Sequence, residues 1–261
     1  MRKAVFFDID GTLWNKYCQI QSSTVAAIRK LRENGHLAFI CSGRSRANIR
    51  NKELLDIGFD GVIASCGTHI DFHKETVFEV LLSETQVAHL LAVARKHNMP
   101  VVLEGPKYIY VNEGDFPDDP YVIYLREELG EDAREIPDDP AEIVINKFSA
   151  EIGDVDLEKL AVDLGPEFDM VVHTGDKVFE VNPIGHSKAT GIQKVCELFD
   201  IAQEDTYAFG DSANDLEMLE FVAHGVAMGN GDENVKAIAD YITTGVEDDG
   251  IANGLKHFGL I

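Results

Sequence analysis

Apolar runs separated by polar, helix-like stretches fill the first third of the chain. The first run, Lys3–Phe7, ends in acidic residues and a glycine. The second, Leu37–Cys41, ends at Ser42-Gly43, and a third lies at Gly61–Ala64. Short apolar runs bounded by turn residues and separated by helical patterns are typical of parallel sheets with crossover helices.

The stretch between the first two runs has the spacing of a helix. Its apolar residues Val25, Ile28 and Leu31 recur every third position. The serine pair 22–23 is expected to precede and cap this helix, and Gly35 predicts its end. A second, polar helix is expected between Ser42-Gly43 and the third run.

The same alternation returns near the C-terminus. Residues 187–199 predict a helix, 206–209 a strand, and the apolar positions of 216–219 another helix. Residues 225–228 and 241–244 predict two further short strands with a helix between them. The two ends of the chain therefore belong to one Rossmann-like parallel-sheet core.

The middle of the chain follows a different order. A helix, a hairpin, a strand, a helix and a second hairpin are predicted in turn, at 84–97, 101–111, 145–152, 155–164 and 168–181. Helix–strand–strand occurs twice, which indicates an antiparallel α+β domain. We therefore expect an α/β protein with a core of residues 1–81 and 185–261, and an inserted α+β cap domain of residues 82–184.

Composition and charge narrow the class of partner. The 261 residues carry a formal net charge of −23, which argues against nucleic acid or an anionic membrane as a partner. An anionic substrate would also be repelled, so a phosphate site needs local cations. Residues 113–142 hold twelve acidic residues and two arginines, a balance of −10. A solvated acidic face or loop is the favoured interpretation, and a functional acidic patch stays open.

Neither a membrane span nor a secretion signal is predicted. No apolar run approaches the ~20 residues that span a bilayer, and the apolar run after Met1 has four residues before it meets acids. We expect a cytoplasmic protein, either a monomer or a small homo-oligomer. The cysteines lack metal-binding spacing, so free thiols are expected rather than a zinc site; they are Cys18, Cys41, Cys66 and Cys196.

Candidate chemistry lies where the predicted strands end. Asp8 and Asp10 directly follow a buried strand, and ligands of parallel α/β sheets bind beyond the carboxyl ends of the strands. Two neighbouring carboxylates need a cation or a shared proton, and Mg²⁺ with its oxygen ligands suits them. A solvated turn is the alternative for this stretch alone.

Three more segments share this placement. Ser42-Gly43-Arg44 can form a phosphate cradle, although an ordinary helix cap would look the same. Lys188 can neutralise a phosphate, although most lysines are merely solvated. The run 210–215 ends another strand and supplies Asp211, Asn214 and Asp215, with a turn and helix cap as the alternative. All four segments would converge on one crevice.

With these four segments in this order, the sequence resembles the haloacid dehalogenase-like (HAD) superfamily, and within it the Cof-type sugar phosphatases. The resemblance covers essentially the whole chain. Asp8-x-Asp10-Gly11-Thr12 matches the first motif, Ser42-Gly43-Arg44 the second and Lys188 the third. Gly210-Asp211-Ser212-x-Asn214-Asp215 matches the fourth. The chain departs from the family pattern at Trp14, at Cys66-Gly67 and at Lys188-Ala189-Thr190-Gly191.

The resemblance implies a Mg²⁺-dependent phosphoric monoester hydrolase. Asp8 would attack phosphorus and form an aspartyl-phosphate, and Asp10 would act as general acid and base. Mg²⁺ would be held by the Asp8 carboxylate, the Asp10 carbonyl and Asp211. The substrate would be a small phosphorylated metabolite, such as a sugar phosphate.

The remaining motif residues receive supporting roles from the same resemblance. Ser42, the Gly43 amide and Lys188 would hold the phosphoryl oxygens, and Asn214 and Asp215 would orient Lys188. The cap would close over the site. Candidate substrate contacts are Arg44, Cys66, Thr68 and Trp14 from the core, with the cap hairpins around Lys107 and Asp176.

Two other functions use the same residues. A phosphotransferase or phosphomutase would pass the phosphoryl group to a sugar instead of water. A phosphate sensor, like an aspartate-phosphorylated receiver domain, would bind without turnover. Receivers lack a large inserted cap, which weighs against the sensor.

Overall fold

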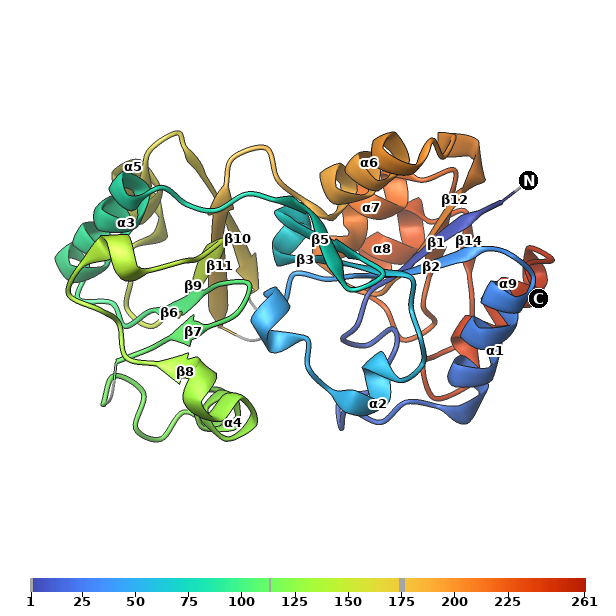
Figure 1. Cartoon of the computed structure of the whole chain (residues 1–261). Coiled ribbons are helices and arrows are strands. Elements are labelled where there is room, and N and C mark those ends of the chain that lie inside the picture. The colour runs from blue at the N-terminus through green and yellow to red at the C-terminus, as the bar shows by residue number, and fades with distance from the viewer. Residues whose placement is uncertain (1, 113, 174–176) are drawn as a thin grey trace. The chain divides into compact units, whose positions relative to one another are not determined.

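The computed structural model describes residues 2–112, 114–173 and 177–261. Contacts divide the chain into two compact units (Figure 1), the first of residues 1–43, 50–79 and 186–261. The second comprises residues 44–49 and 80–185. Its main segment begins and ends within two residues of the predicted insert.

Residues 44–49 also group with the second unit, although the sequence suggested that they belong to the core. Ala47 is buried in an apolar cluster of the insert, and its N–H donates to the Gly105 carbonyl at 3.4 Å. The polar helix expected here is reduced to short pieces, η1 (Arg46–Asn48) and, back in the first unit, α2 (Lys52–Leu55).

One mixed sheet of eight strands organises the first unit, as far as its residues are described. The strand order is β14-β13-β12-β1-β2-β3-β4-β5, and neighbours from β14 to β3 run parallel. The bounds are β1 Ala4–Phe7, β2 Leu37–Cys41, β3 Gly61–Ala64, β4 His69–Phe72, β5 Glu75–Glu79, β12 Thr206–Gly210, β13 His224–Ala227 and β14 Tyr241–Ile242. The predicted α/β class with a parallel core is confirmed.

Helices cover both faces of this sheet (Figure 1). One face carries α6, α7 and α8, and the other carries α1 and α9. The bounds are α1 Ser22–Glu33, α6 Lys188–Phe199, α7 Leu216–Phe221, α8 Glu233–Ile238 and α9 Gly250–His257, with short η2 Ser65–Gly67, η5 Gln203–Asp205 and η6 Ala213–Asp215. Strands buried on both faces read as continuous apolar runs, which is why the sequence revealed them.

Aromatic side chains join the central strands on both faces. The ring of Phe6 stacks on Phe39 with 5.3 Å between centroids, and Phe7 stacks on Phe209 at 5.2 Å on the opposite face. All four are fully buried. These ring contacts hold together the central strands, and the predicted catalytic residues directly follow those strands.

One local prediction for the first unit is wrong, and one hairpin was not predicted. Gln21 occupies the N-cap position of helix α1 without a side-chain capping bond, so the serines 22–23 lie in the first turn instead of capping the helix. The hairpin of β4 and β5 was missed because β5 is mostly exposed and lacks a clear alternation of apolar residues.

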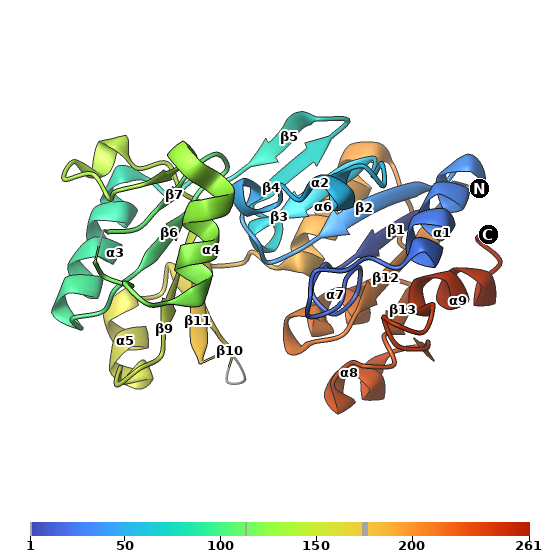
Figure 2. The ribbon, with the colours of Figure 1, turned by 90° about the horizontal axis from the view of Figure 1, so that it is seen from below.

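The second unit is built on its own sheet (Figure 2). The order of the described strands is β10-β11-β9-β6-β7-β8, antiparallel except between β7 and β8. The bounds are β6 Val102–Glu104, β7 Ile109–Tyr110, β8 Ala133–Arg134, β9 Lys147–Glu151, β10 Phe168–His173 and β11 Val178–Pro183. Both predicted hairpins are present, although Asp176 lies outside the described residues.

Alternate residues of this sheet face different helices. Leu103 and Tyr110 pack with α3 (Glu84–Lys96) and α5 (Leu157–Leu164). Val102 and Ile109 pack instead with α4 (Pro120–Leu129). The insert is therefore an α+β unit with its own apolar cores.

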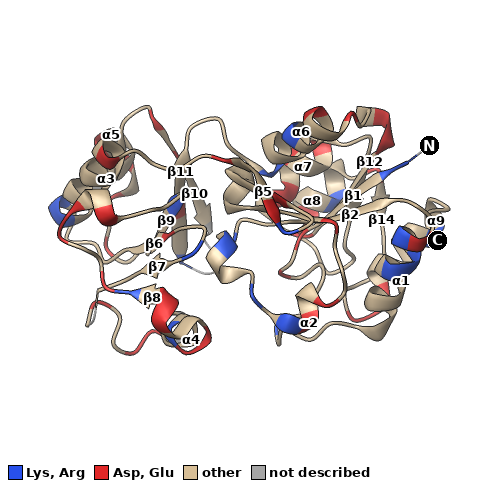
Figure 3. Cartoon of the chain, viewed as in Figure 1, with Lys and Arg blue, Asp and Glu red and all other residues tan. Residues whose placement is uncertain are grey.

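Within the acidic segment, residues 114–142 form helical pieces and not only a loop. It contains α4, whose first turn is capped by Asp119 through a 2.8 Å bond from the Val122 N–H, and the short η3 (Gly130–Asp132) and η4 (Pro140–Glu142). Val122, Leu125 and Leu129 are buried while acidic residues colour the helix in Figure 3. The segment is largely a solvated acidic face.

The sequence also predicted free cysteines and no membrane span. The four cysteines are thiols rather than disulfides. Among the residues that the structure describes, no helix has the length and apolar content needed to cross a membrane.

Candidate active site

Three neighbouring strands bring the predicted motif residues to one edge of the core sheet. Strand β1 lies between β12 and β2, and Phe7 pairs with Phe209 on one side and with Ile40 on the other. Asp8 follows β1, Asp211 follows β12, and Ser42 follows β2. The strand ends thus place separated motifs together, as the sequence predicted.

Lys188 connects two of these motifs. Its Nζ donates to Asp8 Oδ1 at 2.6 Å, to Asp215 Oδ1 at 2.6 Å and to Asn214 Oδ1 at 3.1 Å. Lys188 is the first residue of α6, which Ser187 and Thr190 begin with a capping box. Only 1% of the Lys188 side chain is exposed. The three acceptors therefore fix the position of a buried ammonium group.

Asp215 anchors the loop that follows β12. Its Oδ2 accepts the backbone N–H of Asp211 at 2.9 Å and that of Ser212 at 3.0 Å, while Oδ1 accepts from Lys188. Gly210 is required beneath it, because a Cβ there would lie 2.6 Å from the Asp215 Cβ. Ser212 Oγ donates to Asn214 Oδ1 at 2.9 Å.

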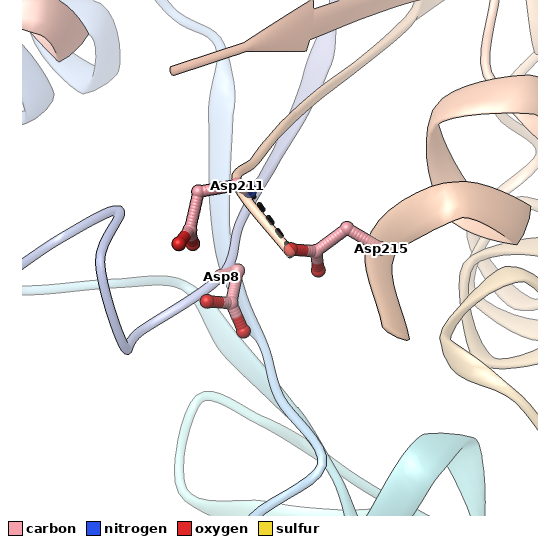
Figure 4. A group of neighbouring side chains, drawn as sticks. All are labelled: Asp8, Asp211 and Asp215. Atoms are coloured by element: carbon pink, nitrogen blue, oxygen red, sulfur yellow. Dashed lines mark hydrogen bonds between the residues drawn. The ribbon is translucent and has the colours of Figure 1, made fainter. Parts of the chain in front are cut away.

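Asp8, Asp211 and Asp215 form a compact acidic cluster (Figure 4). One carboxylate oxygen from each lies within 4.8 Å of the other two. Figure 4 shows the carboxylates of Asp8 and Asp211 close together, with Asp215 turned toward the Asp211 backbone. Both oxygens of Asp215 already accept protein hydrogen bonds, so Asp8 and Asp211 are the better placed pair for a metal ion.

The charge of this cluster exceeds what Lys188 neutralises. Burial, followed by the fields of Asp215 and Asp211, raises the pKa of Asp8 well above its usual value despite the opposing Lys188. Burial and Asp215 likewise raise the pKa of Asp211 to about 7. Burial opposes the charge on Lys188, but Asp215 and Asp8 raise its pKa well above the usual value. A hard divalent cation with oxygen ligands suits such a surplus of buried carboxylate.

The loop after β1 folds tightly against this cluster. Thr12 Oγ1 donates to Asp211 Oδ1 at 2.9 Å. Gly11 has φ +80°, and a Cβ on it would lie 2.2 Å from Asp211 Oδ2. The Asp10 side chain is exposed, and its Oδ1 accepts the indole N–H of Trp14 at 2.9 Å.

Ser42 lies at the start of the second predicted phosphate segment. Its own N–H donates to the Ile63 carbonyl at 2.9 Å, and its carbonyl accepts the Cys66 N–H at 3.3 Å. Gly43 follows it directly. Gly67, at the end of the turn η2, packs against the residue that precedes α6. The contact is so close that a Cβ on Gly67 would lie 2.4 Å from the Ser187 carbonyl oxygen.

The predicted substrate contacts differ in exposure and location. Thr68 is fully buried and donates to the Ser65 carbonyl at 2.8 Å. Cys66 and Trp14 are 7% and 3% exposed. Arg44 belongs to the second unit, where it lines a cavity of about 390 Å³. Lys107 also lies in that unit.

Sequence reasoning missed two residues that brace the site. Thr12 was noted only as part of a motif, yet it holds Asp211. Asn230 Nδ2 donates to the Gly11 carbonyl at 2.9 Å, and its Oδ1 accepts from the Val246 N–H at 2.8 Å. Asn230 could have been found from its position, because Gly229-Asn230-Gly231 comes shortly after β13, which is another parallel strand of the core sheet.

Comparisons with known proteins agree with this arrangement. A family model described as haloacid dehalogenase-like hydrolase matches residues 5–255. YkrA of Bacillus subtilis is 35% identical over 261 residues, covering 99% of this chain and 98% of its own. YitU of the same organism, named 5-amino-6-(5-phospho-D-ribitylamino)uracil phosphatase, is 30% identical, covering 97% of this chain and 96% of its own.

A solved structure is similar across the whole chain. BT4131, described as a HAD subclass IIB sugar phosphatase, superposes with a TM-score of 0.83 at 28% identity. The match covers 99% of this chain and all of that one. Strand-end motifs, inserted unit, family match and phosphatase relatives agree, and the chain therefore belongs to the haloacid dehalogenase-like hydrolases, as a phosphatase of the Cof type.

Proposed function

We propose that the protein is a Mg²⁺-dependent phosphatase that hydrolyses a small phosphorylated metabolite through an aspartyl-phosphate on Asp8. One observation carries the proposal. The Asp8 carboxylate is buried at a strand end, 2.6 Å from the Lys188 ammonium and beside the Asp211 carboxylate. A nucleophile, a phosphate-binding cation and a second metal-ligating acid are thereby combined in one place.

The first step transfers the phosphoryl group to the protein. A carboxylate oxygen of Asp8 attacks phosphorus, and the bond between phosphorus and the ester oxygen breaks. The departing oxygen takes a proton from Asp10 and leaves as a neutral alcohol, so Asp10 becomes a carboxylate. Asp10 is suited to this role because it lies on the exposed side of the loop, two residues from the nucleophile.

The second step releases inorganic phosphate. Asp10, now ionised, accepts a proton from a water molecule as the water attacks phosphorus. The bond between phosphorus and the Asp8 oxygen breaks, and the Asp8 carboxylate and the protonated Asp10 are restored. One alcohol and one phosphate leave for each ester and water consumed.

The remaining residues hold charge and orientation. Lys188 would neutralise the phosphoryl oxygens, with Asn214 and Asp215 fixing its ammonium. Ser42 and the Gly43 amide would donate to the other oxygens at the neighbouring strand end. Fixed donors of this kind need no rearrangement as charge develops.

The acidic cluster supports Mg²⁺ as the cofactor. Asp8, Asp211 and the Asp10 backbone carbonyl would hold the ion, and Thr12 would orient Asp211. When bound, Mg²⁺ would lower the repulsion between the Asp8 carboxylate and an anionic ester. The surplus of buried carboxylate around a single lysine is the observation behind this assignment.

The substrate class follows from the relatives and the inserted unit. YitU and BT4131 are named for a phosphorylated ribitylaminouracil and for sugar phosphates. Both similarities extend over the inserted unit, which we propose acts as a cap that contacts the leaving group. A small phosphorylated metabolite with a sugar or polyol portion is therefore the proposed substrate.

Phosphate release from a panel of sugar, polyol and cofactor phosphates tests the proposal. Turnover should require Mg²⁺, vanish with a chelator and return when Mg²⁺ is restored. Asp8→Asn should abolish turnover while the melting temperature stays near the wild-type value. Full activity of Asp8→Asn, or turnover that ignores the chelator, would contradict the proposal. Phosphoryl transfer to an added sugar in place of phosphate release would identify a phosphotransferase.

A further inference from the structure

We propose that Trp14 is a positioning residue that orients the carboxyl group of Asp10 for proton transfer. The inference rests on the proposed role of Asp10 as general acid and base. The indole Nε1–H of Trp14 donates to Asp10 Oδ1 at 2.9 Å. No sequence motif assigns such a bond, because the two residues are four positions apart in a loop.

The loop geometry makes this contact rigid. Asp10 and Trp14 form an isolated backbone bridge, and the Gly11 N–H donates to the Trp14 carbonyl at 3.0 Å. The Trp14 N–H in turn donates to the Ile9 carbonyl at 3.2 Å. The indole is 3% exposed, whereas Asp10 is exposed. A buried ring thus holds a carboxylate that faces solvent.

Donor chemistry gives the contact its direction. An indole N–H can donate a hydrogen bond but cannot accept one. The same bond is retained after Asp10 ionises, so it serves both steps. The indole therefore holds the carboxyl group of Asp10 in one orientation through both steps.

A pair of substrates separates this role from a structural one. An alkyl phosphate needs a proton on its leaving oxygen, whereas p-nitrophenyl phosphate expels a stable phenolate without one. The ratio kcat/KM reports steps up to formation of the phospho-enzyme, before water is activated. The alkyl phosphate used is the one that the wild type hydrolyses fastest in a set of hexose, pentose and polyol phosphates.

Trp14→Phe keeps an aromatic ring in place and removes only the donor. We expect kcat/KM to fall about tenfold for the alkyl phosphate, as loss of a hydrogen bond to a carboxylate allows. For p-nitrophenyl phosphate, kcat/KM should stay within about twofold of the wild-type value. Equal losses on both substrates, or no loss on either, would overturn the proposal.

The Asp10→Asn variant supplies the matched control. It should lower kcat/KM for the alkyl phosphate by about 10²–10⁴-fold. Adding Trp14→Phe to it should cost nothing further, because the indole acts through the carboxyl group. Independent, multiplicative losses would instead show a structural effect of the ring. If the wild type hydrolyses p-nitrophenyl phosphate, the proposed function stands even where this inference fails. If the wild type hydrolyses neither it nor the alkyl phosphate, the proposed function itself fails.

Fluorescence gives a readout that needs no turnover. Trp14 is the only tryptophan in the chain, so its emission reports this contact directly. Asp10→Ala removes the acceptor and should shift the emission maximum, whereas Asp10→Asn retains an oxygen acceptor and should shift it less. Identical spectra for the wild type and Asp10→Ala would overturn the contact.

Discussion

At the scale of single residues, the site depends on backbone positions that leave no room for a side chain. Gly11 combines φ +80° with a close approach to the Asp211 carboxylate. Its carbonyl is held by Asn230, and Thr12 binds Asp211 directly. The first motif and the fourth therefore fit together through a glycine, beyond any role of the acids themselves.

Gly11→Ala should consequently abolish most activity. A Cβ at 2.2 Å from Asp211 Oδ2 must displace that carboxylate, in addition to the strain of a positive φ. Gly35→Ala is the matched control, since Gly35 has φ +89° and nothing lies within 4 Å of its added Cβ. Both variants should lose about 1 kcal/mol of unfolding free energy from strain, measured by denaturant titration. Only Gly11→Ala should lose phosphatase activity; equal activities would contradict the packing argument.

At the scale of elements, the start of β1 is held by the turn that follows α1. His36 Nδ1 accepts the Lys3 N–H at 3.1 Å, so the ring must be unprotonated at that nitrogen. Burial, followed by the N-terminal and Lys3 charges, lowers the pKa of His36 from about 6.5. The folded chain thus binds this proton less readily than the unfolded chain.

The stability that this histidine contributes is therefore present above pH 6.5 and is lost as pH falls through its lowered pKa. His36→Asn keeps an oxygen acceptor near the Lys3 N–H and removes the titration. Between pH 7 and pH 5, the unfolding free energy of the wild type should fall more than that of His36→Asn, by up to about 1 kcal/mol. Parallel pH curves from urea titrations would show that His36 makes no such contribution.

The sequence predicted elements well where burial dictated their pattern. Strands β1, β2 and β12 are buried throughout and mostly apolar because both faces are covered, so their ends, and the motif residues that follow them, could be located. The hairpin β4–β5 was missed because β5 is largely exposed. Within the site, Asp8, Lys188 and Asp215 lie together as their motifs suggested. The Trp14–Asp10 bond depends on loop geometry that spacing alone does not specify.

At the scale of the whole molecule, charge opposes the proposed substrate. The net charge is −23, and the ribbon coloured for acidic residues in Figure 3 is spread over both units. Lys188 provides positive charge inside the site, but it cannot cancel the long-range field. An anionic phosphate ester is therefore repelled before it reaches the site.

Salt should weaken this repulsion. At constant Mg²⁺ activity, kcat/KM for a dianionic sugar phosphate should rise about threefold as NaCl increases from about 20 to about 300 mM. The turnover number kcat should change little, because the long-range repulsion acts on the substrate only while it approaches the site. A fall in kcat/KM with salt would show that local cations dominate the approach of the substrate.

The central claim is a covalent phosphate on Asp8. Enzyme mixed with substrate and Mg²⁺ is quenched during turnover and treated with borohydride, which reduces an aspartyl-phosphate to homoserine. Peptide mass spectrometry then locates the changed residue. The account predicts homoserine at position 8 only when substrate is present, and none in the Asp8→Asn variant. Turnover with an unmodified Asp8, or homoserine at position 10 or 211 instead, would contradict it.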